Sequence, residues 1–164
     1  AASSANQNSN YTIIIVIIDQ VSKSVIRSTM NLFSPSIQLL GDFFKLTYVE
    51  NSEIAFGINF NNGPIIFTIL ASIATVFISW YLWKSKEQSY IFQLALSFIL
   101  GGAIGNLIDR YLFGKVVDFF HLSVGQFSWP VFNVADSFVT IGMVLYIYSI
   151  YIDERSQSTI NEKN

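Results

Sequence analysis

One stretch of the chain, Pro64 to Trp83, contains no charged residue and is apolar almost throughout. A helix needs about 20 such residues to cross the roughly 30 Å of bilayer hydrocarbon. Aromatic rings crowd the end of the stretch, at Trp80 and Trp83, and Lys84 and Lys86 follow. Aromatic and basic residues are enriched where a span meets the cytoplasmic interface. The stretch therefore predicts a transmembrane helix.

The composition of the whole chain agrees with a membrane environment. Its 164 residues are 52% hydrophobic and 12% charged, with a mean hydropathy of +0.47, whereas soluble domains are about 25% charged. Nine Lys and Arg against eleven Asp and Glu form no basic stripe, which argues against a nucleic-acid partner. The chain has no cysteine and one histidine, His121. We therefore expect no metal site and no cysteine nucleophile.

Three more apolar segments have the length of a span, although the first is interrupted by Asp19 and Lys23. A secretory leader is the alternative for that first segment, but it lacks a basic region before it and a small-residue cleavage site after it. We expect an all-α integral membrane protein with four transmembrane helices, at about 11–30, 64–83, 89–108 and 129–152. This transmembrane domain, 11–152, lies between a disordered tail or expression remnant at 1–10 and a polar C-terminal tail at 153–164.

Two longer connections, 31–63 and 109–128, lie on the same side of the membrane if the spans alternate. Apolar and polar residues alternate over 44–49, a turn-forming group follows at 51–53, and 54–56 is apolar again. This pattern predicts a short hairpin at the membrane surface.

Charged groups within spans cost about 2.5 to 3.5 kcal/mol each at the bilayer centre, so each needs a partner or a purpose. Asp19 and Lys23 stand four residues apart on one helix face, with the acid before the base. They can neutralise each other. The favoured interpretation is that this pair locks the first helix to its neighbours rather than taking a direct chemical role.

Polar groups also cluster at the ends of the third and fourth spans. Asn106, Asp109 and Arg110 share a helix face. This spacing is equally consistent with two interpretations: a cluster that holds loops and substrate carbonyls, or a salt bridge at the helix end. Asn133 and Asp136 share a face in the same way, with no positive residue nearby in the sequence. A carboxylate there must pair with a cation from elsewhere in the chain, bind a proton or lie at a site that water reaches.

Asp118 is framed by Val117 and Phe119 in the second long connection. An exposed loop acid is one interpretation. The other is that apolar surroundings raise its pKa, so that two carboxyls brought together share one proton and act as general acid and general base, as in aspartyl proteases. His121 is more typical of an interfacial or loop histidine than of a catalyst.

Four segments resemble the bacterial lipoprotein signal peptidase family, also called signal peptidase II. They are Asp-Gln-Val-Ser-Lys at 19–23, Gly-Gly-Ala-Ile-Gly-Asn-Leu-Ile-Asp-Arg at 101–110, Val-Val-Asp-Phe at 116–119 and Phe-Asn-Val-Ala-Asp at 132–136. Two positions depart from the family pattern: Ser22 stands where Thr is usual, and Glu53 stands where Gly is common. The second departure affects the turn of the expected hairpin, because glycine permits positive φ at low cost.

The resemblance implies an intramembrane aspartyl endopeptidase that uses Asp118 and Asp136 without a metal or cofactor. Its substrate would be a prolipoprotein whose cysteine carries a diacylglyceryl group, cut on the N-terminal side of that cysteine. The enzyme would lie in the bacterial cytoplasmic (inner) membrane, with both termini cytoplasmic, a small extracytoplasmic β element and the active site near the outer surface. Membrane lipids would surround it, and no obligatory protein partner is implied.

Seven further residues are expected to bind substrate or support the two aspartates: Asn51, Asn106, Asp109, Arg110, Asn133, Asp19 and Lys23. The chief alternative is a small proton-coupled transporter subunit, because membrane carboxylates also form proton relays. That alternative explains Asp118 less well, and the chain shows no internal repeat of the kind transporters use. A structural membrane adaptor would leave the polar clusters unexplained.

Overall fold

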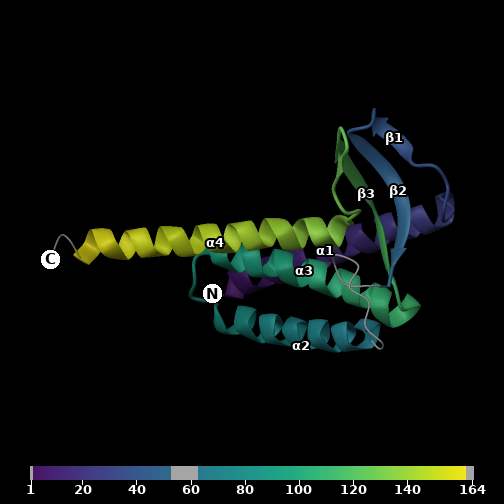
Figure 1. Cartoon of the computed structure of the whole chain (residues 1–164). Coiled ribbons are helices and arrows are strands. Elements are labelled where there is room, and N and C mark those ends of the chain that lie inside the picture. The colour runs from purple at the N-terminus through teal and green to yellow at the C-terminus, as the bar shows by residue number, and fades with distance from the viewer. Residues whose placement is uncertain (1, 53–62, 162–164) are drawn as a thin grey trace.

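The computed structural model describes residues 2–52 and 63–161, which form four helices and a four-stranded sheet (Figure 1). In chain order the elements are α1 (Ala2–Thr29), β1 (Ile37–Leu40), β2 (Phe44–Asn51), α2 (Gly63–Lys84), α3 (Tyr90–Phe113), β3 (Val116–Val124), β4 (Phe127–Ser128) and α4 (Val134–Asn161).

Helix α3 is the centre of the bundle, because it packs against α1, α2 and α4. Glycines make this close packing possible. A Cβ built on Gly101 would lie 2.9 Å from the Cβ of Ile15 in α1, and one on Gly105 would lie 2.5 Å from a carboxylate oxygen of Asp19. Small residues at such positions let helix backbones approach within a membrane.

Three helices in the described part of the chain are long and apolar enough to cross a membrane: Ile65–Lys84, Tyr90–Phe113 and Val134–Ser156. They correspond to the second, third and fourth predicted spans. Helix α1 does not meet the same criterion of length and composition, and it carries Asp19, Lys23 and Arg27.

Helices α1 and α4 extend into the terminal segments for which composition predicts polar tails. Helix α1 begins at Ala2 and α4 continues to Asn161. Adding a residue to an existing helix costs far less than nucleating one, so polar residues continue a helix that an apolar segment has already formed. The beginning of α1 and the end of α4 lie at the end of the bundle opposite the sheet (Figure 1).

The antiparallel sheet, in the order β1-β2-β3-β4, corrects the prediction of an all-α protein. Of the predicted hairpin, the segment 44–49 is a strand and belongs to β2. Strand β2 pairs with β1 across a turn at 41–43, where Gly41 has a φ of +52° that glycine adopts readily. Asn51, where the predicted turn begins, is the last residue of β2 and pairs with Val116 of β3. The remaining predicted hairpin residues, Glu53 and 54–56, lie outside the described residues.

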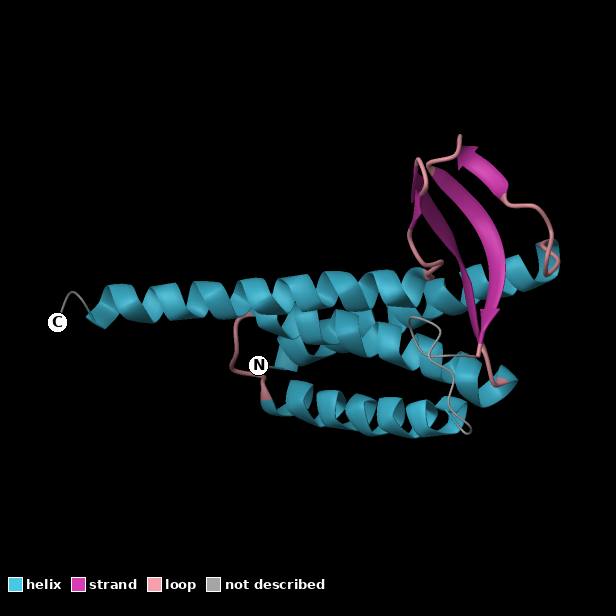
Figure 2. Cartoon of the chain, viewed as in Figure 1, coloured by secondary structure: helices cyan, strands magenta, loops and turns pink. Residues whose placement is uncertain are grey.

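The sheet stands at one end of the helices, beside the end of α1 and the start of α4 (Figure 2). Val117 and Phe119 of β3 pack on Ile26 of α1 and on Met30, which directly follows α1. Successive strand residues face opposite ways, so Asp118 points to the other side of β3. It is only 4% exposed, and the interpretation of Asp118 as an exposed loop acid is therefore wrong.

Candidate active site

Asp136 belongs to the first turn of α4, where it forms a reciprocal pair with Asn133. The backbone N–H of Asp136 donates to Asn133 Oδ1 at 2.9 Å, and the backbone N–H of Asn133 donates to Asp136 Oδ2 at 3.1 Å. This is the arrangement of a capping box, with the N-cap residue and the third helical residue satisfying each other's amides. The N-terminus of a helix also favours negative charge. The local sequence thus places the Asp136 carboxyl group at the start of α4.

Asp118 reaches the same place from the sheet. Asn133 Nδ2 donates to its Oδ1 at 2.7 Å, and Asn51 Nδ2, at the end of β2, donates to its Oδ2 at 3.1 Å. Burial, and then the nearby charge of Asp136, raise the pKa of Asp118 from its ordinary 3.8 to about 7. The two amide donors oppose this rise but do not cancel it. At neutral pH the pair can therefore hold one proton and one negative charge.

Asn106 of α3 completes the polar contacts of Asp136. Its Nδ2 donates to Asp136 Oδ1 at 2.8 Å, while its Oδ1 accepts from Lys23 Nζ at 2.9 Å and from Asn133 Nδ2 at 3.1 Å. An ammonium group can only donate, so Lys23 requires the oxygen of this amide to face it. The nitrogen is left to face Asp136. Lys23 thereby sets the orientation of the Asn106 amide, which contacts Asp136. Asp136 and Asp118 together are named the candidate dyad.

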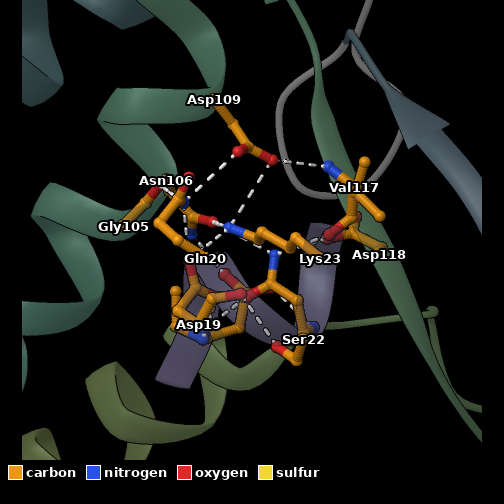
Figure 3. A network of polar contacts seen from close by, with 12 residues as sticks. Asp19, Gln20, Ser22, Lys23, Gly105, Asn106, Asp109, Val117 and Asp118 are labelled. Atoms are coloured by element: carbon orange, nitrogen blue, oxygen red, sulfur yellow. Dashed lines mark hydrogen bonds and ion pairs between the residues drawn. The ribbon is translucent and has the colours of Figure 1, made fainter. Parts of the chain in front are cut away.

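Lys23 lies at the centre of a buried ionic network that joins α1 to α3 (Figure 3). Its ammonium is 2.8 Å from Asp19 and 3.7 Å from Asp109, and all three side chains are fully buried. The predicted Asp19–Lys23 pair is therefore present. Asp19 also accepts the backbone N–H of Ala135 in α4 at 2.9 Å, and Asp109 accepts that of Val117 in β3 at 3.0 Å. One network thus fixes the relative positions of α1, α3, α4 and β3.

Two members of this network, Gln20 and Arg27, are not identified from the sequence as supporting residues. Gln20 donates to both Asp19 and Asp109, at 3.1 and 3.3 Å. Arg27 pairs with Asp109 at 2.8 Å, and its guanidinium lies 4.0 Å from the centroid of the Phe113 ring. The signal for Arg27 is its spacing, because it continues the four-residue series of Asp19 and Lys23 along one face of α1.

Both aspartates line a single cavity of about 310 Å³, here named the catalytic cavity. Of the predicted group at the end of α3, Asn106 and Arg110 line it, whereas Asp109 does not and instead faces α1 and β3. The described residues that line it are Asn51, Asn106, Arg110, Val116, Asp118, Trp129, Pro130, Val131, Phe132, Asp136, Val139 and Thr140.

His121 lies on β3 away from the catalytic cavity. Its ring nitrogens contact hydroxyls on neighbouring strands, Thr47 at 2.9 Å and Ser128 at 2.6 Å. Across residues 2–52 and 63–161, no three His, Cys, Asp or Glu side chains form a group suited to a metal ion. The polar side chains among the described residues that line the catalytic cavity are two carboxyls, one guanidinium, two amides, the hydroxyl of Thr140 and the indole of Trp129. These groups can bind a peptide, transfer protons and activate a water molecule.

Comparison of the sequence with known proteins gives one family. The family model described as signal peptidase II (SPase II), peptidase family A8, matches residues 11–152. The lipoprotein signal peptidase of Desulforapulum autotrophicum is 37% identical over 145 residues, covering 86% of this chain and 89% of that protein. That of Alteromonas mediterranea is 40% identical over 148 residues, covering 88% and 80%.

A solved bacterial membrane enzyme, determined by the in meso method at 2.3 Å resolution, superposes with a TM-score of 0.80 and 32% identity, covering 91% of this chain and 90% of that one. A second, at 1.9 Å resolution, gives a TM-score of 0.77 and 33% identity, with coverages of 88% and 92%. The helices, the sheet and the polar segments therefore have a common origin with those proteins, and the chain belongs to the signal peptidase II family.

Proposed function

We propose that the protein is an intramembrane aspartic endopeptidase that removes the signal peptide from diacylglyceryl-modified prolipoproteins, cutting on the N-terminal side of the lipidated cysteine. The observation that carries this proposal is the pairing of Asp118 and Asp136. They arise from different elements, line one cavity and are both contacted by Asn133. The family match supports the substrate class and leaves the transporter alternative without support.

In the proposed mechanism a water molecule attacks the scissile carbonyl between the two carboxyls. Asp136 is the ionised base, since α4 begins there and amide donors surround its oxygens. Asp118 is the acid, since its raised pKa keeps a proton on it near neutral pH. Asp136 takes the proton of the water while Asp118 donates to the carbonyl oxygen. No metal or cofactor takes part in these steps.

The supporting residues have separate roles in this proposal. Asn51 and Asn133 orient Asp118, and Asn106 orients Asp136. Arg110 lines the catalytic cavity, where its guanidinium can bind a substrate carbonyl. Three more residues act indirectly by holding the helices and the orientation of Asn106: Asp19, Lys23 and Asp109.

We propose that α1 also crosses the membrane, as a fourth span within a transmembrane peptidase domain at 11–152. Its charged residues Asp19 and Lys23 are fully buried against α3, whereas the residues it exposes between Ile13 and Val25 are apolar apart from Ser24. Those residues are about half exposed and suit contact with lipid: Ile13, Ile14, Ile17, Ile18, Val21 and Val25. Charges hidden inside the bundle do not oppose insertion as exposed charges would.

The membrane arrangement follows from the same proposal. The protein lies in the bacterial inner membrane with both termini in the cytoplasm, and the sheet and the dyad lie at the outer surface. It acts without an obligatory protein partner. Single cysteines test this topology with a membrane-impermeant thiol reagent in intact cells. We expect labelling at Thr47→Cys and Ser123→Cys and none at Ser85→Cys, and the reverse pattern would contradict it.

The catalytic proposal is tested by cleavage of a lipidated precursor by the purified protein. We expect Asp118→Asn and Asp136→Asn each to lower turnover by roughly 10²- to 10⁴-fold, because each removes a proton-transfer group while keeping the size of the side chain. The double variant should be little worse than either single variant. Asp42→Asn is the matched control, since Asp42 is exposed at the sheet turn. Near-native cleavage by either dyad variant would refute the mechanism.

A further inference from the structure

A second cavity of about 320 Å³ lies beside the catalytic cavity, and nothing in the proposed mechanism uses it. We name it the apolar groove. Among the described residues that line it, the only hydroxyl is that of Ser137, which already donates to the backbone oxygen of Asn133 at 2.9 Å. The apolar groove therefore offers hydrocarbon and aromatic contacts alone. It is lined by Phe43, Phe44, Phe120, Leu122, Phe132 and Ser137.

The apolar groove adjoins the catalytic cavity, because the two share the lining residue Phe132. Alternation along β3 places Asp118, Phe120 and Leu122 on one face, so the acid belongs to one cavity and the two apolar residues to the next. Phe132 lines both cavities. It is held there by paired backbone hydrogen bonds with Phe120, at 2.7 and 3.0 Å, and the two rings are 5.6 Å apart.

A substrate chain bound at Asp118 and Asp136 can extend in two directions. On one side the catalytic cavity continues along α4 to Val139 and Thr140, within a candidate span. On the other side the apolar groove continues along β3 from Phe120 to Leu122, into the sheet. A signal peptide embedded in the membrane suits the α4 side. The residue that follows the scissile bond would then lie on the side of the groove.

We infer that the apolar groove holds an acyl chain of the diacylglyceryl group on the substrate cysteine. This inference rests on the proposed function, since the lipidated cysteine is the first residue after the scissile bond. The lining fits hydrocarbon and offers nothing to a headgroup or a peptide backbone. The groove thus recognises the lipid next to the bond that is cut.

The expected role is positioning rather than added affinity. Bilayer lipid tails are as apolar as a protein interior, so moving an acyl chain from lipid into the groove brings little hydrophobic gain. A chain held at Phe120 and Leu122 does fix the glyceryl-cysteine relative to Asp118, and orientation of this kind accelerates the chemical step. The groove should therefore affect the ratio of kcat/KM between substrates with long acyl chains and substrates with short ones.

The test uses the purified full chain in detergent and two precursors of identical peptide sequence, one with palmitoyl and one with butanoyl chains on the glyceryl group. We expect the wild type to have the higher kcat/KM on the palmitoyl precursor. Leu122→Trp, which fills the groove, should lower the palmitoyl-to-butanoyl ratio of kcat/KM by at least about tenfold, as expected for steric changes in an apolar pocket. Leu39→Trp should leave the ratio unchanged, because Leu39 is exposed on β1 and does not line the groove.

A second measurement covers the case in which Leu122→Trp fails to fold. An acyl chain with a terminal diazirine is cross-linked to the Asp136→Asn variant, which retains the substrate, and the attachment site is mapped. We expect labels on Phe43 or Phe44. Labels confined to the membrane-facing helices, or a ratio unchanged by Leu122→Trp, would overturn the inference while leaving the proposed function intact. Failure of the wild type to cut either precursor would instead refute the proposed function, and the inference with it.

Discussion

Replacing Asp118 with asparagine is expected to stop acid–base chemistry and, at the same time, to stabilise the fold above neutral pH. The pKa of this carboxyl is about 7 in the folded protein, against 3.8 when it is free. Below pH 3.8 both the folded and the unfolded chain hold the proton. Between pH 3.8 and 7 only the folded chain holds it, so the stability of the wild type falls as pH rises through this window. Above pH 7 the Asp118 carboxyl is ionised in the folded chain as well, and the loss of folding stability is complete.

The size of the effect follows from the same values. A rise from 3.8 to about 7, at about 1.36 kcal/mol per pKa unit, gives a cost of about 4 kcal/mol at pH 8 for a side chain that is 4% exposed. Asparagine avoids that cost. It also places an amide nitrogen where Asp118 accepts from Asn51 or Asn133, which loses a hydrogen bond worth about 1 kcal/mol. The net gain is about 3 kcal/mol.

Thermal unfolding in detergent at pH 5 and pH 8 measures this difference. We expect the unfolding temperature of the wild type to fall between these two values of pH and that of Asp118→Asn to change much less. Asp42→Asn should behave as the wild type, because the Asp42 side chain is 87% exposed. A wild type whose stability does not vary with pH, or an Asp118→Asn protein that is less stable than the wild type at pH 8, would refute the assignment of a raised pKa to this group.

Three further predictions concern the helix packing and the network behind the dyad. A Cβ at Gly102 would overlap the carbonyl oxygen of Ala135, so Gly102→Ala should lower stability by about 1 to 3 kcal/mol in thermal unfolding. Lys23→Met leaves the buried Asp19 without its cation and should cost about 3 to 5 kcal/mol, and adding Asp19→Asn should recover part of that loss; an unchanged unfolding temperature in the single variant would contradict the network. Arg110→Lys should keep the charge but lose the planar fork, so turnover of a lipidated precursor should fall, and normal turnover would show that charge alone is enough.

Much of this protein could be predicted from local patterns. Apolar runs of span length predict α2, α3 and the body of α4, because a helix in hydrocarbon must satisfy its own backbone. The four-residue spacing of Asp19 and Lys23 predicts their ion pair, since such residues share a helix face. The polar segments also carry the family resemblance, which the family match confirms.

Other features depend on contacts between distant segments. The burial of Asp118 arises because β2 pairs with β3, and Asn51 becomes a donor to it only through that pairing, across 67 positions of the chain. The separation of Asp109 from Asn106 and Arg110 is set by where α1 packs, since Asp109 turns to Lys23 and Arg27. No local pattern carries this information.

The sequence by itself therefore determined the helices, the acidic and amide residues and the family, because these depend on the period of an apolar face and on short motifs. The tertiary structure alone decided that Asp118 is buried, how the amide of Asn106 is oriented and where the apolar groove lies. These depend on the pairing of β2 with β3 and on the burial of Lys23 between helices. Long-range packing sets the environment of a side chain, and that environment sets its pKa and its orientation.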